Sequence, residues 1–327
     1  MLMRSILVTG GAGYIGSHVC KALAQAGFQP VTYDSLIYGH EWAVNWGPLE
    51  VGELSDGDRL DQVMRKYGPE GIIHLAAFAY VGESVSNPLK YYKNNVGGTI
   101  SLVESAHRNG VKKFVFSSTC ATYGVPKNVP IVESEPPHPV NPYGASKLMV
   151  ERVLADCAVA YGLEWCALRY FNAAGADPAC RIGESHDPET HLIPLIIDVA
   201  KGVRPHITIF GNDYDTPDGT CIRDYIHVDD LADAHVRALE RLGSSLPTII
   251  NLGTGRGYSV LEVIDSVQAV TNNPILVEVG ARRAGDPARL VSDPSLALDA
   301  LGWKAQYVEI GPIVDTAWRW HCRESPA

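Results

Sequence analysis

The stretch Ile6-Leu7-Val8-Thr9-Gly10-Gly11-Ala12-Gly13-Tyr14-Ile15-Gly16 joins an apolar run to a glycine-rich turn and the start of a helical pattern. Gly11, Gly13 and Gly16 satisfy the G-x-G-x-x-G spacing. Glycine permits a tight turn and lets the backbone approach a pyrophosphate, whose charge is favoured by the N–H groups of the following helix. The stretch therefore predicts a dinucleotide site, although tight turns that bind no ligand also use glycine.

Outward from this turn, short apolar runs alternate with helical patterns through the first half of the chain. The predicted strands cover residues 5–9, 30–34, 71–76, 113–117 and 163–170. The predicted helices, with apolar residues at three and four spacing, cover residues 14–26, 58–67, 89–109 and 143–161. This alternation predicts an α/β fold, a Rossmann-type doubly wound parallel sheet with right-handed crossovers.

The alternation loosens beyond about residue 171. Connections rich in Gly, Pro and Asp at 172–189 and 211–220 flank a helical stretch at 192–201, and helices at 228–241 and 260–271 flank a strand at 248–252. We expect a cofactor-binding domain over residues 1–172, to which segments near 227–255 return. A smaller substrate-binding lobe of mixed α/β structure is expected over residues 173–327.

The composition is that of an ordinary globular protein, because 46% of the 327 residues are hydrophobic and 20% are charged. The net charge of −10 argues against nucleic acid or an anionic membrane as the main partner, since both require a broad basic surface. No apolar run reaches the ~18 residues of a membrane helix, and the first residues lack a signal-peptide pattern. Seven widely spaced cysteines without a C-x-x-C pair indicate reduced thiols and no metal site. We therefore expect a cytoplasmic enzyme.

A carboxylate follows the second predicted strand. Asp34 lies 18 residues after Gly16, where it can accept hydrogen bonds from ribose hydroxyls and would repel a 2′-phosphate. No arginine follows immediately, so the pattern favours NAD over NADP as the cofactor.

A second group of polar residues predicts acid-base chemistry. In Asn141-Pro142-Tyr143-Gly144-Ala145-Ser146-Lys147, Pro142 is suited to open a helix, and Tyr143 and Lys147 then lie one turn apart. A neighbouring ammonium favours the phenolate of a tyrosine whose ordinary pKa is near ~10, so Tyr143 becomes a candidate general base. Thr119, at the end of a predicted strand, supplies a hydroxyl to orient the reacting oxygen. A Y-x-x-x-K pattern alone usually marks a solvent-exposed helix face. The prediction of acid-base chemistry therefore depends on its combination with the glycine turn and Thr119.

Several runs together resemble the extended short-chain dehydrogenase/reductase family over essentially the full chain, and within it the nucleotide-sugar epimerases. They are TGGAGYIGSH (9–18), VGES (81–84), YGASK (143–147), RYFN (169–172) and RDYIHV (223–228). The resemblance implies a tightly held NAD, reduced and reoxidised within one turnover, and inversion of the C4 hydroxyl of a UDP-hexose. It also implies a homodimer formed through helices of the cofactor domain.

The resemblance further implies roles for individual residues. The catalytic residues would be Tyr143, Lys147 and Thr119. The cofactor contacts would be Gly10, Gly13, Tyr14, Ile15, Gly16, Asp34, Glu53, Leu54, Leu75, Ala76, Ala77, Asn94, Ser117, Tyr143, Lys147, Tyr170 and Phe171. The contacts with the UDP-sugar would be Thr119, Asn172, His191, Leu192, Thr208, Phe210, Arg223, Arg283, Asp286 and Leu290.

Three positions depart from the family pattern. Ala79 stands where well-known members have a lysine near the cofactor. His191 stands where they have an asparagine, which leaves its contact with uridine or sugar open. Leu290 occupies the gate position, where a large residue excludes N-acetyl sugars, and its intermediate size favours plain hexoses.

Five other functions compete with hexose epimerisation. Related dehydratases and decarboxylases carry acidic residues after the threonine, whereas Cys120 and Ala121 follow Thr119 here, which disfavours both. A UDP-pentose 4-epimerase acting on xylose or arabinose, or a UDP-N-acetylhexosamine 4-epimerase, stays open. A non-catalytic NAD-sensing regulator would be expected to have lost Tyr143 or Lys147, and both are present.

Overall fold

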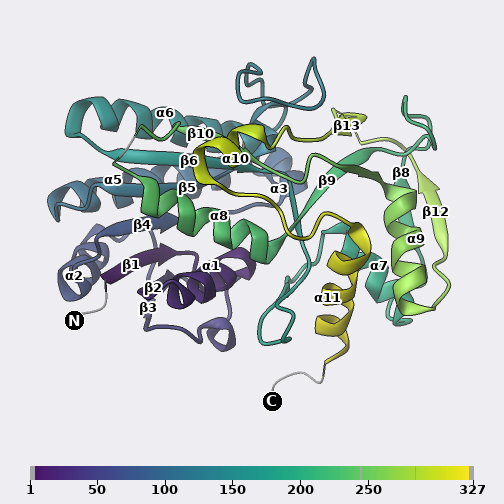
Figure 1. Ribbon diagram of the computed structural model, residues 1–327, viewed down its shortest axis with the longest axis horizontal. Helices are drawn as coiled ribbons and strands as arrows, with labels where there is room; N and C mark the ends of the chain where they lie inside the picture. Colours follow the sequence, from purple (N-terminus) through teal and green to yellow (C-terminus); the bar gives the residue numbers. More distant parts are fainter. Residues whose placement is uncertain (1–3, 244, 284, 324–327) are drawn as a thin grey trace.

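A computed structural model describes residues 4–243, 245–283 and 285–323. Its largest element is a seven-stranded parallel sheet in the order β10-β6-β5-β4-β1-β2-β3. The strands are β1 (Arg4–Thr9), β2 (Phe28–Asp34), β3 (Leu49–Val51), β4 (Gly71–His74), β5 (Lys113–Thr119), β6 (Glu164–Tyr170) and β10 (Ile249–Leu252). The predicted Rossmann-type fold is confirmed, and β10 is the strand predicted at 248–252 (Figure 1).

Helices cover both faces of this sheet because its strands are apolar on both sides. Along β1, Ile6 and Val8 enter one buried cluster, whereas Leu7 enters another. The first cluster includes residues of α1 (Tyr14–Gln25), α8 (Val228–Arg241) and α10 (Ser295–Leu301). The second includes residues of α2 (Gly57–Tyr67), α5 (Gly98–Arg108) and α6 (Pro142–Tyr161). The sheet is thus the middle layer of three.

Residues 89–109, predicted as one helix, are helical but are divided into successive segments of different helix type. They consist of α4 (Pro88–Tyr91), a π-helical turn η2 (Tyr92–Gly97) and α5, and a short helix α3 (Val81–Ser86) that was not predicted precedes them. Asn95 in η2 is buried, where it donates from Nδ2 to the Phe78 carbonyl oxygen and to the Ser146 hydroxyl, both at 3.0 Å. The π turn therefore connects the segment after β4 to helix α6.

The second half of the chain forms two smaller sheets whose strands were mostly not predicted. β7 (Asn172–Ala174), β9 (Ile222–His227), β11 (Gly257–Ser259) and β13 (Arg289–Leu290) form one, and β8 (Ile207–Phe210) pairs with β12 (Val277–Gly280). The helices beside them are α7 (Leu192–Ala200), α9 (Val260–Thr271) and α11 (Ile310–Cys322). A third buried cluster lies between these helices and strands. These strands have only two to six residues, too few for a clear apolar period.

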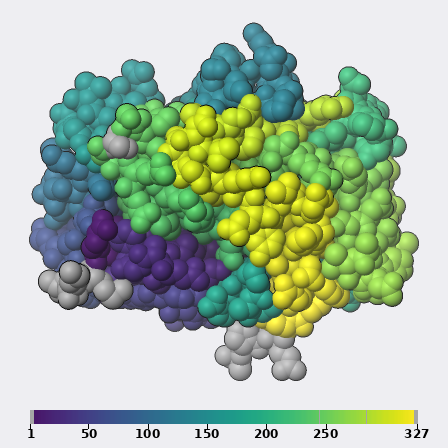
Figure 2. Space-filling model, in the orientation of Figure 1, coloured from purple at the N-terminus to yellow at the C-terminus, as the bar shows by residue number. Residues whose placement is uncertain are grey.

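The C-terminal segment crosses back over the large sheet before it reaches α11. Trp303 donates from Nε1 to the Asp230 carbonyl oxygen at 2.9 Å, and Gln306 N and Tyr307 N donate to the Asp230 carboxylate. Figure 2 shows this segment in yellow beside the green part of the chain that includes α8. Among the described residues, no helix has the length and apolar character that a membrane crossing requires.

Candidate active site

The turn between β1 and α1 leaves no room for side chains. Gly10 has a φ of +75°, and a Cβ atom on it would lie 2.6 Å from the backbone nitrogen of Ala76. A Cβ atom on Gly16 would lie 2.0 Å from the Gly10 carbonyl oxygen. Gly13 occupies the N-cap position of α1, so no side chain covers the first N–H groups of the helix. The turn therefore fits the close approach of a pyrophosphate.

This turn lies where the strand order of the sheet reverses. β1 pairs with β2 on one side and with β4 on the other. Leu75 N and Ala76 N, just after β4, both donate to the Thr9 carbonyl oxygen at 3.0 Å. The crevice at such a reversal is where open α/β sheets bind ligands. Predicted cofactor residues from β1 and β4 thus come together at one position.

Asp34 ends β2 beside the same turn. Its Oδ2 accepts from Ala12 N at 3.0 Å and its Oδ1 from Leu36 N at 2.9 Å. Burial raises the pKa of Asp34, and these two hydrogen bonds oppose the rise. The carboxylate braces the glycine turn, a contact that the sequence did not indicate.

Other predicted cofactor residues lie on neighbouring elements. The Tyr33 hydroxyl donates to the Glu53 carbonyl oxygen at 2.8 Å, and Leu54 is buried in the cluster under α2, α5 and α6. Asn94 lies in the π turn, where its Nδ2 donates to Asn95 Oδ1 at 2.9 Å. Sequence analysis missed Asn95. The signal that could have found it was a second asparagine, directly after Asn94, on the buried face of a helical pattern.

Helix α6 begins where Pro142 predicted it, and Asn141 caps it by accepting from Gly144 N at 2.8 Å. Tyr143 and Lys147 lie on its buried face. The Thr119 side chain at the end of β5 lies close enough to Tyr143 to lower the pKa of its phenol. The structure thus brings together the three residues predicted to be catalytic.

The electrostatics of this group differ from the sequence expectation. Lys147 donates from Nζ to the Ser117 carbonyl oxygen at 2.8 Å and lies 4.8 Å from the centre of the Phe116 ring. Burial raises the pKa of Tyr143 well above its ordinary value, and the nearby Thr119 side chain opposes this rise without cancelling it. The sequence predicted a lowered pKa for the Tyr143 phenol. In the protein chain by itself the pKa is raised instead, because desolvation disfavours the phenolate.

A buried ion pair one turn beyond Lys147 was also missed. Glu151 accepts from Arg169 Nε at 2.9 Å and Nη2 at 2.5 Å, and from the Ser118 hydroxyl at 2.6 Å. Burial lowers the pKa of Lys147 to about 7, and the negative charge of Glu151 opposes that lowering. The signal in the sequence was a glutamate four residues after the lysine on one helix face.

Several predicted substrate contacts meet around β9. Arg223 pairs with Asp286 and lies opposite Leu290 in the β9–β13 register. Asn172 donates from Nδ2 to the Asp224 carbonyl oxygen at 3.1 Å. Leu290 also packs on a cluster at the end of β5 and β6 that consists of Cys120, Tyr123, Ile131 and Phe171. The gate position therefore lies beside the predicted cofactor residue Phe171.

Asp224 is a structural carboxylate that sequence analysis did not single out. It is buried and accepts from Thr254 N at 2.9 Å, Gly255 N at 3.1 Å and Ser292 N at 3.1 Å. It thereby fixes two loops next to Arg223.

The remaining predicted substrate residues lie on other elements. Thr208 and Phe210 are on β8, and the guanidinium of Arg283 lies 4.1 Å from the centre of the Phe210 ring. Leu192 begins α7, and His191 directly before it contacts Glu184. His191 thus takes part in a group of side chains that the sequence did not predict.

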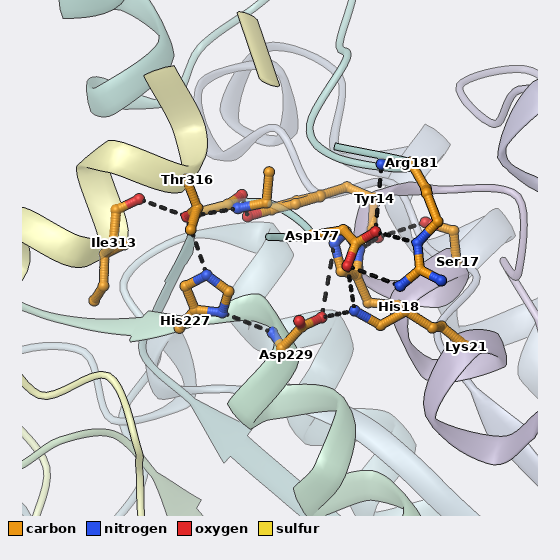
Figure 3. A network of polar contacts seen from close by, with 12 residues as sticks. Tyr14, Ser17, His18, Lys21, Asp177, Arg181, His227, Asp229, Ile313 and Thr316 are labelled. Carbon is orange, nitrogen blue, oxygen red and sulfur yellow. Dashed lines mark hydrogen bonds and ion pairs between the residues drawn. The ribbon is translucent and has the colours of Figure 1, made fainter. Parts of the chain in front are cut away.

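Behind the glycine turn, a buried polar network connects α1 to the second half of the chain (Figure 3). Lys21 contacts Asp177 Oδ1 at 3.0 Å and Asp229 Oδ1 at 2.6 Å. The Tyr14 hydroxyl donates to the Gly175 carbonyl oxygen at 2.6 Å. The cofactor turn is therefore held against the loop that follows β7.

Comparison with known proteins agrees with this geometry. A family model described as "NAD dependent epimerase/dehydratase family" matches residues 6–253. The UDP-glucose 4-epimerase of Rhizobium meliloti is 51% identical, with 99% of each chain covered. The crystal structure of UDP-glucose 4-epimerase from Brucella ovis in complex with NAD has a TM-score of 0.94 and 52% identity, covering 97% of this chain and 98% of that one. The Bifidobacterium longum enzyme in complex with NAD+ and UDP has a TM-score of 0.92 and 37% identity, covering 97% and 98%. This chain belongs to the NAD-dependent epimerase/dehydratase family.

Proposed function

We propose that this protein is a UDP-glucose 4-epimerase, which interconverts UDP-galactose and UDP-glucose with bound NAD. The observation that carries the proposal is that Tyr143, on the buried face of α6, lies beside Thr119 at the end of β5, with the buried amine of Lys147 one helical turn away and anchored to the Ser117 carbonyl oxygen of the same strand. Full-length relatives at 51% and 52% identity that are named UDP-glucose 4-epimerases support it.

The residues that would hold NAD form one side of the site. The backbone around Gly10, Gly13 and Gly16 would receive the pyrophosphate, and Asp34 the adenosine ribose hydroxyls. Leu75, Ala76, Ala77, Ser117, Tyr170 and Phe171, at the ends of neighbouring strands, would surround the rest of the cofactor. When bound there, NAD would supply the hydride acceptor and donor for C4 of the sugar.

The chain's own contribution is proton transfer at the C4 hydroxyl. The Tyr143 oxygen would take the hydroxyl proton and later return it, while Thr119 holds the reacting oxygen in place by its hydroxyl. A charged Lys147 favours the phenolate, and so does any further positive charge next to the ring. Burial opposes that phenolate by raising the pKa of Tyr143, and these positive charges act against it.

The UDP-sugar would lie on the β9 side. Arg223 and Arg283 suit a diphosphate, because a guanidinium pairs with two oxygens at once. Asp286 pairs with Arg223 in the structure and would orient it. The assignment of NAD to residues 1–172 with segments near 227–255, and of the sugar nucleotide to 173–327, belongs to this proposal.

We also expect a cytoplasmic homodimer. All seven cysteines are free thiols, which suits a reducing compartment. Helices α5 and α6 expose the apolar side chains of Ile100, Met149 and Val159, the last of them 91% exposed. Apolar patches of this kind on paired helices suit an interface with a second copy of the chain.

The direct test is to incubate the purified protein with UDP-galactose and measure UDP-glucose. We expect interconversion without added cofactor. Absence of interconversion while NAD remains bound would instead support a non-catalytic sensor. A parallel panel of UDP-N-acetylgalactosamine and UDP-arabinose distinguishes the hexose from the N-acetylhexosamine and pentose activities.

A further inference from the structure

Among the residues that the structure describes, one group of side chains has the composition of a metal site. Glu184, His186, Glu189 and His191 come from the loop between β7 and α7, and their donor atoms all lie within 4.8 Å of one another. We call this set the Glu-His cluster. The cysteine spacing, on which no metal site was expected, gave no sign of this cluster.

The donor atoms are spaced for a single ion. Nδ1 of His186 lies 3.1 Å from Oε1 of Glu184 and 3.7 Å from Oε2 of Glu189. Nδ1 of His191 contacts the same Glu184 oxygen and lies 3.8 Å from Oε1 of Glu189. Four ligands about 2.1 Å from a zinc ion lie about 3.4 Å apart in a tetrahedron. Small side-chain movements would therefore bring all four donors onto one ion.

The protein around the cluster is closely packed. Trp320 of α11 donates from Nε1 to the Glu184 carbonyl oxygen at 2.7 Å, and a Cβ atom on Gly183 would lie 2.5 Å from the Trp320 ring. The His186 ring meets the Tyr14 ring of α1 edge-on at 6.2 Å. Its Nδ1 is buried and, among the described residues, has no partner with hydrogen-bond geometry, although it lies close to two carboxylates. A buried polar atom in this condition calls for a further ligand.

Charge and ligand chemistry select the ion. Two carboxylates carry a charge of −2, which one divalent cation balances while both imidazoles are neutral ligands. Imidazole nitrogen suits zinc and its transition-metal neighbours, whereas magnesium and calcium prefer oxygen alone.

We propose that the Glu-His cluster is a structural zinc site to which each of the four side chains supplies one ligand. Four protein ligands fill a tetrahedral ion, the arrangement of structural rather than catalytic zinc. The ion would fasten the loop that packs on Tyr14 of α1 and Trp320 of α11 and that leads into α7. His191 is also among the residues expected to contact the UDP-sugar, so the metal site is tested by metal content and Tm rather than by turnover.

The test uses untagged, full-length protein, because a histidine tag would itself bind zinc. After chelation and dialysis the protein is reloaded with zinc, and the bound metal is measured by atomic emission. We expect one equivalent per chain, together with a rise in Tm on adding zinc and a tetrahedral visible spectrum on adding Co²⁺. His191→Gln and His186→Gln should each lose the bound metal and the Tm response. His191 is 51% exposed, so its replacement should leave the fold intact.

The matched control is His206→Gln, which alters a histidine outside the cluster, 3.1 Å from Glu278. This variant should keep the full equivalent of zinc. If the wild-type protein retains no metal after reloading, the cluster consists of imidazolium-carboxylate pairs and the proposal is overturned. The same follows if zinc binds equally to the wild type, His186→Gln and His191→Gln.

Discussion

The Nζ atom of Lys147 donates to the backbone carbonyl oxygen of Ser117 at 2.8 Å, so the lysine of α6 is anchored to the end of β5. Two residues further along the same strand, the Thr119 side chain lies beside Tyr143 and lowers the pKa of its phenol. The end of β5 thus contacts both Tyr143 and Lys147 of the helix. The relationship suggests that the strand sets the geometry for proton transfer.

Replacing Tyr143 with Phe removes the group that would carry the C4 proton. We expect kcat to fall by roughly 10²–10⁴-fold, the usual contribution of a positioned acid or base. NAD should remain bound, because the ring stays buried. The rate is measured on UDP-galactose, and NAD is quantified after denaturation. Tyr161→Phe, on the exposed end of the same helix, is the control; a near-native rate for Tyr143→Phe would exclude it as the base.

Replacing Glu151 with Gln should move the pH profile. Lys147 is charged below its pKa of about 7 and neutral above it, and the charge of Glu151 raises that pKa. Removing the charge lowers the pKa of Lys147. As the pH rises, activity should therefore begin to decline at a lower pH than in the wild type, and kcat at pH 7 should be roughly ten-fold lower. Ser118→Ala removes one hydrogen bond to Glu151 but keeps the charge, and should leave the profile in place. An unshifted profile in Glu151→Gln would refute this role.

Replacing Asp34 with Asn should weaken NAD binding. A hydrogen bond to a charged group contributes about 1.5–3 kcal/mol, so we expect roughly a 10- to 100-fold higher Kd. The amide oxygen can still accept from one of the two backbone N–H groups, so the turn should persist. Titration calorimetry on cofactor-free protein measures the change. Asp58→Asn, an exposed residue at the start of α2, should bind NAD as the wild type does.

Replacing Leu290 with Ala should widen the range of sugars. Leu290 is partly buried against Phe171 and Cys120, so truncation opens space next to the proposed C4 site. We expect the ratio of kcat/KM for UDP-N-acetylgalactosamine over UDP-galactose to rise about ten-fold, the effect of a few methylenes in a pocket. The stability loss should be about 1–2 kcal/mol, below the value for a fully buried leucine. Leu298→Ala, half exposed on α10, should leave the ratio unchanged.

Replacing Met149 with Glu should separate the proposed dimer. Met149 is 47% exposed on α6, and a charge buried there in an interface would oppose association. Light scattering should show a dimer for the wild type and a monomer for the variant. Val203→Glu, at an exposed apolar residue after α7, should remain dimeric. A wild-type monomer would contradict the proposed interface.

Local rules account for the parts that were predicted. The glycine turn, the position of Asp34 and the one-turn spacing of Tyr143 and Lys147 each depend on a few neighbouring residues. The alternation of apolar runs with helices was long enough to establish the large sheet. The short strands of the second half were missed because stretches such as β12, with its valines exposed, carry no buried alternation.

The sequence by itself therefore determined the Rossmann-type sheet, the glycine turn and the placement of Tyr143 and Lys147 one turn apart on a helix. Only the tertiary structure decided that Arg223 meets Asp286, that Glu151 is held by Arg169, and that Glu184 and Glu189 face two histidines. It also decided that the pKa of Tyr143 is raised rather than lowered. The physical reason is that desolvation and side-chain pairing depend on what the whole fold packs around a group, which no short stretch of sequence specifies.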